Sequence, residues 1–322
     1  MAKRRLTKQQ RDRIKLNQAE KALSMQKLGD EQKGKLVAHY GIYVDIEDKH
    51  EKIHRCNLRQ NIPALVVGDR VVWKEASDGQ GIVVALLPRE TELTRHDSRG
   101  QEKLVAANVD QIIVTCAVLP EFSLFLLDSY LAAAELTDIP AIIVLNKIDL
   151  SDEEQSNYYN EQLNIYHELG YTVLMLSAET GDNINTLKEA LSQHSSVFVG
   201  QSGVGKSSLI QYFVTNEALV VGELSEKQKL GRHTTTTSKL YPLKNGGNII
   251  DSPGVREFGL GNVGGRALLK AFKELAPFLG ECKFRNCSHQ HEPGCALLQA
   301  LEDGKINPSR MESFQKLFKL IE

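Results

Sequence analysis

Residues 200–207 carry the clearest chemical signature of this 322-residue chain. They read Gly-Gln-Ser-Gly-Val-Gly-Lys-Ser and fit the phosphate-binding pattern G-x-x-x-x-G-K-[ST]. Glycines let the backbone wrap around phosphate groups with its N–H groups pointing inward, and the following helix N-terminus adds positive potential. We expect Lys206 to contact the β- and γ-phosphates of a nucleotide and the Ser207 hydroxyl to bind Mg²⁺. The predicted phosphate-binding residues are Gly200, Gln201, Ser202, Gly203, Val204, Gly205, Lys206, Ser207 and Ser208.

A second group of residues predicts which base the nucleotide carries. Residues 146–149 read Asn-Lys-Ile-Asp and match the guanine-recognition sequence N-K-x-D. A carboxylate at Asp149 can accept hydrogen bonds from N1–H and the 2-amino group of guanine, which adenine lacks, so GTP is favoured over ATP. Ser177 and Ala178 resemble the short loop whose backbone contacts the guanine oxygen. The predicted base-binding residues are Asn146, Lys147, Ile148, Asp149, Ser177 and Ala178.

The order of these two motifs is unusual. Asn146 lies 54 residues before Gly200, whereas in ordinary small GTPases the base-reading motif follows the phosphate-binding loop. The nucleotide-binding domain is therefore predicted to be circularly permuted.

Two further segments match the switch regions of GTPases. Residues 251–254, Asp-Ser-Pro-Gly, fit D-x-x-G, in which Asp251 holds Mg²⁺ through water and the Gly254 amide senses the γ-phosphate. Residues 231–237, Gly-Arg-His-Thr-Thr-Thr-Thr, predict a mobile switch loop, one of whose threonines binds Mg²⁺ in the GTP state. Without the other motifs, a solvated loop would be the simpler interpretation of that threonine run.

Val255 occupies the position where Ras-like proteins have the glutamine that orients the attacking water. An aliphatic side chain cannot polarise water, so efficient hydrolysis requires another group or an activating partner. His233 is the best internal candidate, because a neutral imidazole in the switch loop can orient water. The alternative is a structural or solvent-facing histidine.

A cysteine cluster near the C-terminus predicts a metal site. Cys282, Cys287, His289 and Cys295 form C-x4-C-x-H-x5-C, a donor set that satisfies tetrahedral zinc and leaves no open position, as in structural sites. His291 is a rival ligand, and a set of free thiols is the alternative.

The other two cysteines, Cys56 and Cys116, stand apart and are expected to be unligated. Neither a signal peptide nor a long apolar span is recognisable, which predicts a reducing cytoplasm, no membrane association and no disulfides.

The elements that must position these residues follow from apolar patterning. Continuous apolar runs typical of buried parallel strands occur at 140–145, 171–176, 196–199 and 248–250. Apolar spacing typical of helices occurs at 125–137, 184–193, 207–214, 265–279 and 311–320. Strands that alternate with helices predict an α/β core of the P-loop class.

Length and charge divide the chain further. A chain of 322 residues exceeds one ordinary core, so two or three domains are expected. The net charge is −2, yet residues 1–35 hold eleven Lys or Arg against four Asp or Glu, a net of +7. Such a basic segment is typical of a disordered tail that binds nucleic acid, or of a merely solubilising one. We expect a tail at 1–34, a β-barrel at 35–98, the nucleotide-binding core at 99–262 and a zinc-binding, mainly helical subdomain at 263–322.

Residues 34–44, 69–73 and 81–87 predict the strands of the barrel, with turn chemistry at 76–81. We expect a barrel of the oligonucleotide-binding type, although strand count alone does not separate it from an SH3-like barrel. Tyr40, Tyr43 and Trp73 could stack on bases, but aromatic residues in so small a barrel more often form its core.

The permuted motifs, the barrel and the cysteine pattern together resemble the RsgA (YjeQ) family of bacterial circularly permuted GTPases, over nearly the whole chain. The resemblance implies an OB-fold domain, a permuted GTPase domain and a zinc finger. It also implies GTP/GDP, Mg²⁺ and one structural Zn²⁺ as cofactors. The implied role is late maturation of the small (30S) ribosomal subunit, with hydrolysis stimulated by that subunit and its rRNA as partner. By the same match Thr235 binds Mg²⁺, and the candidate catalytic residues are His233, Lys206 and Thr235. We expect a monomer and no DNA partner.

Two other functions fit parts of the sequence. An RNA-binding assembly scaffold with a structural, slowly hydrolysed nucleotide agrees with Val255. A metabolic P-loop kinase agrees with the phosphate loop but not with Asp149. We also hypothesise that nucleotide state sets the angle of the zinc-binding subdomain, because the chain enters it directly after the D-x-x-G segment.

Overall fold

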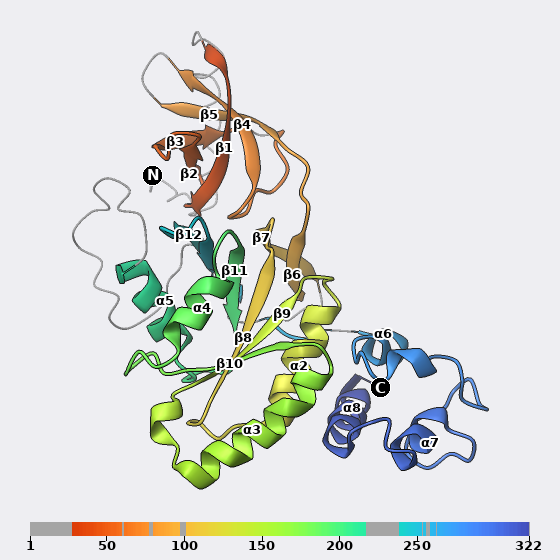
Figure 1. Cartoon of the computed structure of the whole chain (residues 1–322). Helices are drawn as coiled ribbons and strands as arrows, with labels where there is room; N and C mark the ends of the chain where they lie inside the picture. The colour runs from red at the N-terminus through yellow and green to blue at the C-terminus, as the bar shows by residue number, and fades with distance from the viewer. Residues whose placement is uncertain are drawn as a thin grey trace, which may run out of the picture.

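The computed structural model describes residues 28–59, 61–76, 80–96, 101–216, 238–252, 254–255, 258–261 and 263–321. These residues form three parts (Figure 1): a β-barrel near the N-terminus, a central α/β core and a helical subdomain at the C-terminus.

Five strands close into the barrel, namely β1 (Leu28–His39), β2 (Tyr43–Asp48), β3 (Ile53–Leu58), β4 (Arg70–Ala76) and β5 (Gly81–Leu86). Strand β1 pairs antiparallel with both β2 and β4, while β3 pairs antiparallel with β2 and parallel with β5. Because β5 also pairs with β4, the sheet closes on itself. A closed five-stranded barrel fits the oligonucleotide-binding fold of the two barrel types considered.

The aromatic residues of the barrel divide between its core and its surface. Trp73 is 1% exposed and belongs to the core, as expected. Tyr40 and Tyr43 are half-buried and stack on each other, with ring centroids 4.8 Å apart. The guanidinium of Arg55 lies 4.5 Å from the centroid of the Tyr43 ring. This stack is accessible to solvent.

The predicted end of the tail at residue 34 is wrong, because β1 begins at Leu28. Within this segment Gln32 pairs with Trp73 and Lys33 with Val72. The pairing uses backbone groups, so a polar segment that buries little can still be held in a closed barrel. The rest of the expected tail, residues 1–27, lies outside the described residues.

The core elements are β8 (Gln111–Ala117), α2 (Leu124–Glu135), β9 (Ala141–Asn146), η1 (Ile148–Leu150), α3 (Glu153–Glu168), β10 (Thr172–Met175), α4 (Ile184–Ala190), β11 (Ser195–Val199), α5 (Lys206–Asn216), β12 (Ser238–Pro242) and β13 (Asn248–Asp251). Strands β10, β9, β8, β11 and β13 are parallel in this spatial order, and β12 adds antiparallel. Strand β12 also pairs with β1 of the barrel, so a single sheet runs through both parts.

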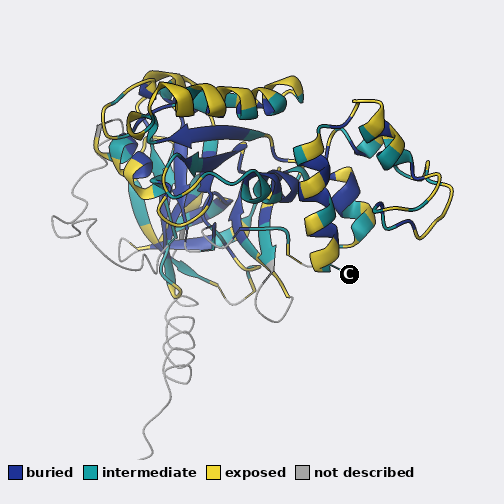
Figure 2. Ribbon diagram, turned by 90° about the horizontal axis from the view of Figure 1, so that it is seen from below, coloured by how far each residue is buried: buried dark blue, intermediate teal, exposed yellow. Residues whose placement is uncertain are grey.

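Alternating side chains of the core sheet bury its two faces under different helices. Ile112 clusters with Leu127 of α2, whereas the next residue, Ile113, clusters with Leu187 of α4 and Phe213 of α5. Figure 2 shows the buried strands between helices whose outer surfaces are exposed. This layered arrangement confirms the predicted α/β core.

Helix α3 was not predicted, because its sequence is mostly polar. Only Tyr159, Leu163 and Tyr166 are buried, at the i, i+4, i+7 spacing of one narrow stripe. Its start carries a reciprocal capping box between Asp152 and Gln155, a signal that the sequence does contain.

A two-stranded hairpin connects the barrel with the core. It consists of β6 (Glu92–His96) and β7 (Glu102–Ala107) and was not predicted. The predicted boundary between residues 98 and 99 falls between its two strands. Residue Val67 of the barrel forms an isolated parallel bridge with Ala106 of β7.

The C-terminal subdomain (263–321) contains α6 (Gly265–Lys270), η3 (Ala276–Phe278), α7 (Ala296–Glu302) and α8 (Pro308–Ile321). The prediction of one helix over 265–279 is wrong, because α6 ends at Lys270 and a separate single turn follows. Pro277 lies in that turn, and inside a continuous helix its ring would clash with the preceding turn. The predicted helix 311–320 is confirmed within α8, whose Phe314, Leu317 and Phe318 are buried.

Buried ion pairs join the C-terminal subdomain to the core. Arg310 of α8 is 1% exposed and pairs with Asp128 of α2, which is fully buried. The same guanidinium donates to both carboxylate oxygens of Glu274, at 2.6 and 3.2 Å. Tyr166 of α3 donates to Asp128 at 2.7 Å. One arginine therefore binds groups from both parts.

Candidate functional site

The phosphate-binding loop follows β11 and leads into α5, as predicted. Gly200 has φ +136°, and a Cβ there would lie 2.0 Å from the Thr115 carbonyl oxygen. A Cβ at Gly205 would lie 2.2 Å from the Asn146 amide nitrogen. The loop thus wraps tightly because these positions lack side chains. Lys206 Nζ donates to the Gly200 and Gln201 carbonyls at 2.7 Å each, which holds the ammonium at the loop.

Asn146 joins the phosphate loop to the Ser-Ala loop. Its side chain is 1% exposed; Nδ2 donates to the Val204 carbonyl at 3.0 Å, and Oδ1 accepts from the Ala178 amide at 3.1 Å. Lys147 donates from Nζ to the carbonyls of Gly203, at 2.7 Å, and Leu119, at 2.8 Å. The structure therefore brings together three segments that are distant in the sequence.

Asp149 lies in the exposed turn η1, directly after β9. Its carboxylate accepts a hydrogen bond from Ser177, whose hydroxyl also accepts from the amides of Glu179 and Thr180. Ser177 is fully buried and fixes the Asp149 carboxylate at the surface. An oriented, accessible carboxylate at the end of a parallel strand fits the recognition of guanine.

The D-x-x-G segment begins at the end of β13, which pairs with β11 in parallel. The parallel register places Asp251 at the same sheet edge as the phosphate loop. Asp251 is 7% exposed, and the Ser252 hydroxyl lies 2.8 Å from the Ser238 hydroxyl at the start of β12. Gly254 packs against β7, where a Cβ would lie 2.8 Å from a methyl of Val105.

The predicted switch loop lies outside the described residues. His233 and Thr235 therefore stay predictions, as does the choice of threonine for Mg²⁺. Val255 is 3% exposed and belongs to the large buried cluster of the barrel and core. A buried aliphatic side chain cannot orient water, which agrees with the chemical expectation for this position.

A cavity of about 660 Å³ lies where the barrel, the hairpin and the D-x-x-G segment meet. The barrel contributes His39, Tyr40 and Tyr43, while Gly254 lies on the core side. Ser238 and Ser252 also line it, so residues flanking both switch segments reach this cavity.

Four donor atoms converge in the C-terminal subdomain. The ligand atoms of Cys282, Cys287, His289 and Cys295 all lie within 4.8 Å of one another. His289 Nδ1 is 3.5 Å from the sulfurs of Cys282 and Cys295, and those sulfurs are 3.9 Å apart. A tetrahedral zinc ion with bonds of about 2.0–2.3 Å holds its donors about 3.5–3.8 Å apart. The cluster therefore fits zinc.

Neighbouring residues favour His289 over His291 as the fourth ligand. His289 is 8% exposed, and its carbonyl accepts from Gln315 of α8 at 2.7 Å, whereas His291 is exposed. Glu292 orders the loop between them by accepting from the amide and hydroxyl of Ser288. Those bonds hold the pKa of Glu292 well below its usual range.

The two remaining cysteines lie elsewhere. Burial raises the pKa of Cys56 and of Cys116 to about 12, and neither thiol lies among the four converging donor atoms.

The comparisons with known proteins agree with this geometry. A family model described as RsgA GTPase matches residues 86–261. The chain belongs to the RsgA GTPase family. Curated relatives named small ribosomal subunit biogenesis GTPase RsgA occur in Haemophilus influenzae (strain PittGG), at 45% identity over 99% of this chain and 96% of the relative. Another, from Pseudomonas savastanoi pv. phaseolicola, is 47% identical over 98% and 97%.

Solved structures of the family share this fold. YjeQ from Thermotoga maritima superposes with a TM-score of 0.74 and 33% identity, covering 91% of this chain and 99% of that one. YloQ, described as a circularly permuted GTPase, gives a TM-score of 0.71 at 27% identity, covering 91% and 95%. The RsgA family assignment and the motif order identify the core as a circularly permuted GTPase domain.

Sequence reasoning missed several residues that support the site. The Leu119 carbonyl, which holds Lys147, carries no side-chain signal. Val105 lies in the short strand β7, whose few apolar residues form no distinctive pattern in the sequence. Neither could have been found without the fold.

The described residues include no helix long and apolar enough to cross a membrane.

Proposed function

We propose that this chain binds the small ribosomal subunit, acts in its late maturation, and hydrolyses GTP faster when the subunit is bound. The observation that carries the proposal is the permuted guanine-nucleotide site within a chain that matches relatives named small ribosomal subunit biogenesis GTPases over nearly its full length. Family membership supports a GTPase, and the partner follows from the names of these relatives.

The nucleotide site supports specific roles for its residues. The phosphate-loop amides and Lys206 would bind the phosphates, and Asp149 would bind guanine with Asn146 and Lys147 as braces. Ser207 and Thr235 would hold Mg²⁺, which lowers the barrier by stabilising charge on the phosphates. Gly254 would sense the γ-phosphate through its amide.

Hydrolysis needs a group that orients water. The buried Val255 cannot do so, which supports two sources: His233 from the switch loop, or a group that the ribosomal subunit contributes. We propose His233 as the internal residue, positioned when the subunit binds.

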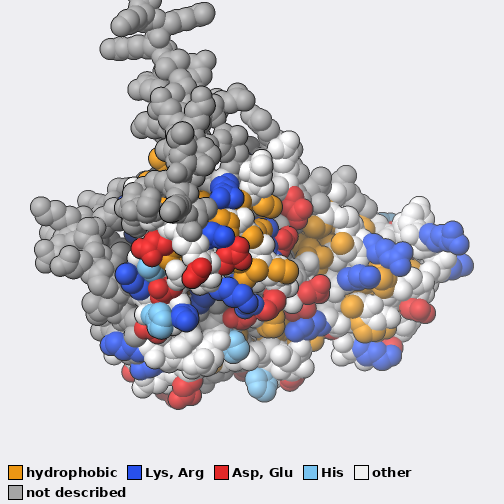
Figure 3. Space-filling model, turned by 90° about the horizontal axis from the view of Figure 1, so that it is seen from above, with side chains coloured by type: hydrophobic (Ala, Val, Ile, Leu, Met, Phe, Trp, Pro, Cys, Tyr) orange, Lys and Arg blue, Asp and Glu red, His pale blue; other side chains and the backbone are white. Residues whose placement is uncertain are grey.

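Two surfaces that solvent can reach suit RNA. In the zinc-binding loop Lys283, Phe284 and Arg285 are exposed, with Lys283 Nζ 5.4 Å from the Phe284 ring centroid. In the barrel, the stacked Tyr40 and Tyr43 offer an aromatic face. Cations interleaved with aromatic rings suit phosphate contact and base stacking. Figure 3 shows Lys and Arg at the C-terminal-subdomain end, and mixed charges over the barrel.

The domain division follows the same logic. We propose a basic tail before residue 28, a barrel to about 87, a connecting hairpin, the GTPase core to about 262 and the zinc-binding subdomain beyond it. One structural Zn²⁺ would be held by Cys282, Cys287, His289 and Cys295, and it would contribute folding energy rather than chemistry. A cytoplasmic, monomeric protein stays a prediction.

The GTP hydrolysis rate should be measured with and without purified small ribosomal subunits, with large subunits as control. Strong stimulation by small subunits alone supports the proposal. A rate that stays very slow with every RNA partner, while GTP still binds tightly, would favour the alternative of an RNA-binding scaffold.

Three variants test the residue roles. Lys206→Ala and Ser207→Ala should abolish turnover, because each removes a contact to phosphate or Mg²⁺. His233→Ala should lower stimulated turnover about 10²-fold or more and leave nucleotide affinity near normal. Loss of GTP binding in His233→Ala would instead make His233 structural.

A further inference from the structure

Ser238, which follows the predicted switch loop, and Gly254 of the D-x-x-G segment both lie on the barrel side of the core. Strand β12 follows the switch loop directly, and its first residue, Ser238, pairs with His39 of the barrel strand β1. Gly254 contacts the β6–β7 hairpin. Ser238 and Gly254 therefore border elements that belong to the barrel or are bound to it.

The contact at Gly254 is unusually close. A Cβ at Gly254 would lie 2.8 and 3.0 Å from the two methyl carbons of Val105, and 3.4 Å from Arg95 Nε. Val105 is only 7% exposed and shares a buried cluster with Val255 and Phe258, which follow Gly254 in the chain. The backbone at Gly254 therefore rests on the Val105 side chain.

The base of the hairpin is fixed to the barrel. Ala107 donates its amide to the Val67 carbonyl at 3.0 Å, and Asn108 Nδ2 donates to the Gly68 carbonyl at 2.8 Å. Gly68 has φ +93°, and a Cβ there would lie 2.0 Å from the Ala107 carbonyl oxygen. The strand that carries Val105 thus cannot shift without moving the barrel.

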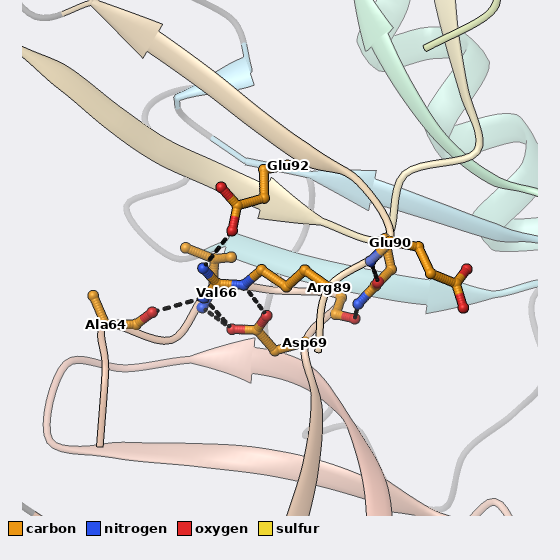
Figure 4. A network of polar contacts seen from close by, with 8 residues as sticks. Ala64, Val66, Asp69, Arg89, Glu90 and Glu92 are labelled. Atoms are coloured by element: carbon orange, nitrogen blue, oxygen red, sulfur yellow. Dashed lines mark hydrogen bonds and ion pairs between the residues drawn. The ribbon is translucent and has the colours of Figure 1, made fainter. Parts of the chain in front are cut away.

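A second set of contacts fixes the chain just before β6, at the same base of the hairpin (Figure 4). Arg89, just before β6, pairs with the fully buried Asp69 of the barrel at 2.7 Å and donates to the Ala64 carbonyl at 2.8 Å. Asp69 in turn accepts from the Val66 amide at 2.8 Å. The hydrogen bonds that Arg89 donates to Asp69 are the main reason that the pKa of Arg89 is raised.

We propose that Val105 is a positioning residue for Gly254, so that the hairpin couples the barrel to the γ-phosphate sensor. The inference rests on the proposed role of Gly254. A ligand that moves or rigidifies the barrel would change the orientation of the Gly254 amide through the hairpin. The three atoms nearest to a Cβ at Gly254 all belong to Val105 and Arg95 of the hairpin.

The test uses the full-length, zinc-loaded protein and titrations of GDP and of a non-hydrolysable GTP analogue. Val105→Ala should weaken binding of the analogue about fivefold or more and change GDP affinity less than twofold, since only the analogue engages the γ-phosphate sensor. Val105→Ile keeps the branched contact and should restore analogue affinity. Thr94→Val, which removes a hydrogen bond to Glu102 on the same hairpin, is the matched control and should affect neither.

A double-mutant cycle adds an independent readout. Gly254→Ala should reduce analogue affinity because its methyl group meets Val105, and Val105→Ala in the same chain should recover part of that loss. Additive effects, or equal weakening of GDP and analogue by Val105→Ala, would overturn the inference.

The cycle also separates this inference from the proposed function. If Gly254→Ala reduces analogue affinity but Val105→Ala leaves it unchanged, the inference on Val105 is overturned and the proposed role of Gly254 stands. No response to Gly254→Ala would remove the proposed role of Gly254, and this inference with it.

Discussion

The core of this GTPase has two junctions, and they are built differently. At the junction with the C-terminal subdomain, helices α2 and α8 pack directly and enclose Arg310, Asp128 and Glu274. At the junction with the barrel, β1 pairs with β12, and barrel, hairpin and core share a buried apolar cluster, beside a cavity of about 660 Å³. A network of buried ion pairs characterises the first junction, and a cavity adjoins the second.

The difference indicates which junction can respond to nucleotide. A buried arginine with two carboxylate partners resists displacement, because a shift would leave charges unpaired away from water. A cavity lined by Ser238, Ser252 and Gly254 leaves room for side chains to move. We therefore favour the barrel side as the coupling route, and the hypothesis that nucleotide state sets the angle of the zinc-binding subdomain has less support.

Removal of zinc should produce the largest effect on the packed junction. His289 and Phe314 of α8 lie side by side, with ring centroids 5.9 Å apart, so the metal loop supports the helix that carries Arg310. Structural zinc contributes about 10–16 kcal/mol of apparent binding energy. Cys295→Ser should release one zinc equivalent and unfold the C-terminal subdomain, as measured by metal analysis and circular dichroism. Intact helices in a zinc-free protein would contradict the assignment; Cys116→Ser is the matched control.

The next largest effect should follow from Arg310→Met. It leaves Asp128 and Glu274 buried without their partner, which should lower the free energy of unfolding by about 3–5 kcal/mol. Urea denaturation measures this loss. Lys316→Met on the same helix breaks only an exposed pair with Glu312 and should change stability by less than about 0.5 kcal/mol. Equal losses of stability in the two variants would contradict a stabilising role of the buried ion pairs at this junction.

At the barrel junction, Arg89→Met should lower the free energy of unfolding less than Arg310→Met does. Arg89 is 14% exposed and the Val66 amide still donates to Asp69 in this variant, so a loss of about 1.5–3 kcal/mol is expected. Arg70→Met, which breaks an exposed pair with Glu90, is the control. Unlike Arg310→Met, Arg89→Met should also reduce stimulation of hydrolysis by small subunits. If small subunits stimulate GTP hydrolysis by Arg89→Met as strongly as by the unchanged protein, this barrel contact has no influence on hydrolysis.

The smallest effect concerns pH. Burial lowers the pKa of His39, against a smaller opposite effect of Asp69, and its Nδ1 accepts from the Gly41 amide at 3.1 Å. The folded state disfavours protonation of His39, so neutral His39 contributes to the free energy of unfolding above a pH of about 6.5, its pKa in the unfolded chain. This contribution is lost as the pH falls through the lower pKa of His39 in the folded state. His39→Gln should flatten that dependence, with a change below about 1 kcal/mol. An unchanged pH profile of unfolding would exclude His39 as its source.

The sequence predicted the residues of the nucleotide and zinc sites better than the elements and contacts that join the three parts of the chain. The phosphate loop, residues 146–149 and the cysteine cluster were found because each demands particular residue types at fixed spacing. Helix α3 and the hairpin were missed because polar or short segments carry little periodicity. Arg310 was missed because its partners, Asp128 and Glu274, are 182 and 36 residues away in the sequence. The start of β1 was misplaced because backbone pairing leaves no side-chain signal.

The most direct test of this comparison is hydrogen–deuterium exchange of the full chain, with GDP and then with a non-hydrolysable GTP analogue. The account predicts that the analogue changes protection in β1, β12 and the β6–β7 hairpin, and leaves α2 and α8 unchanged. Altered protection at α2 and α8, with an unchanged hairpin, would contradict it and return the coupling to the zinc-binding side.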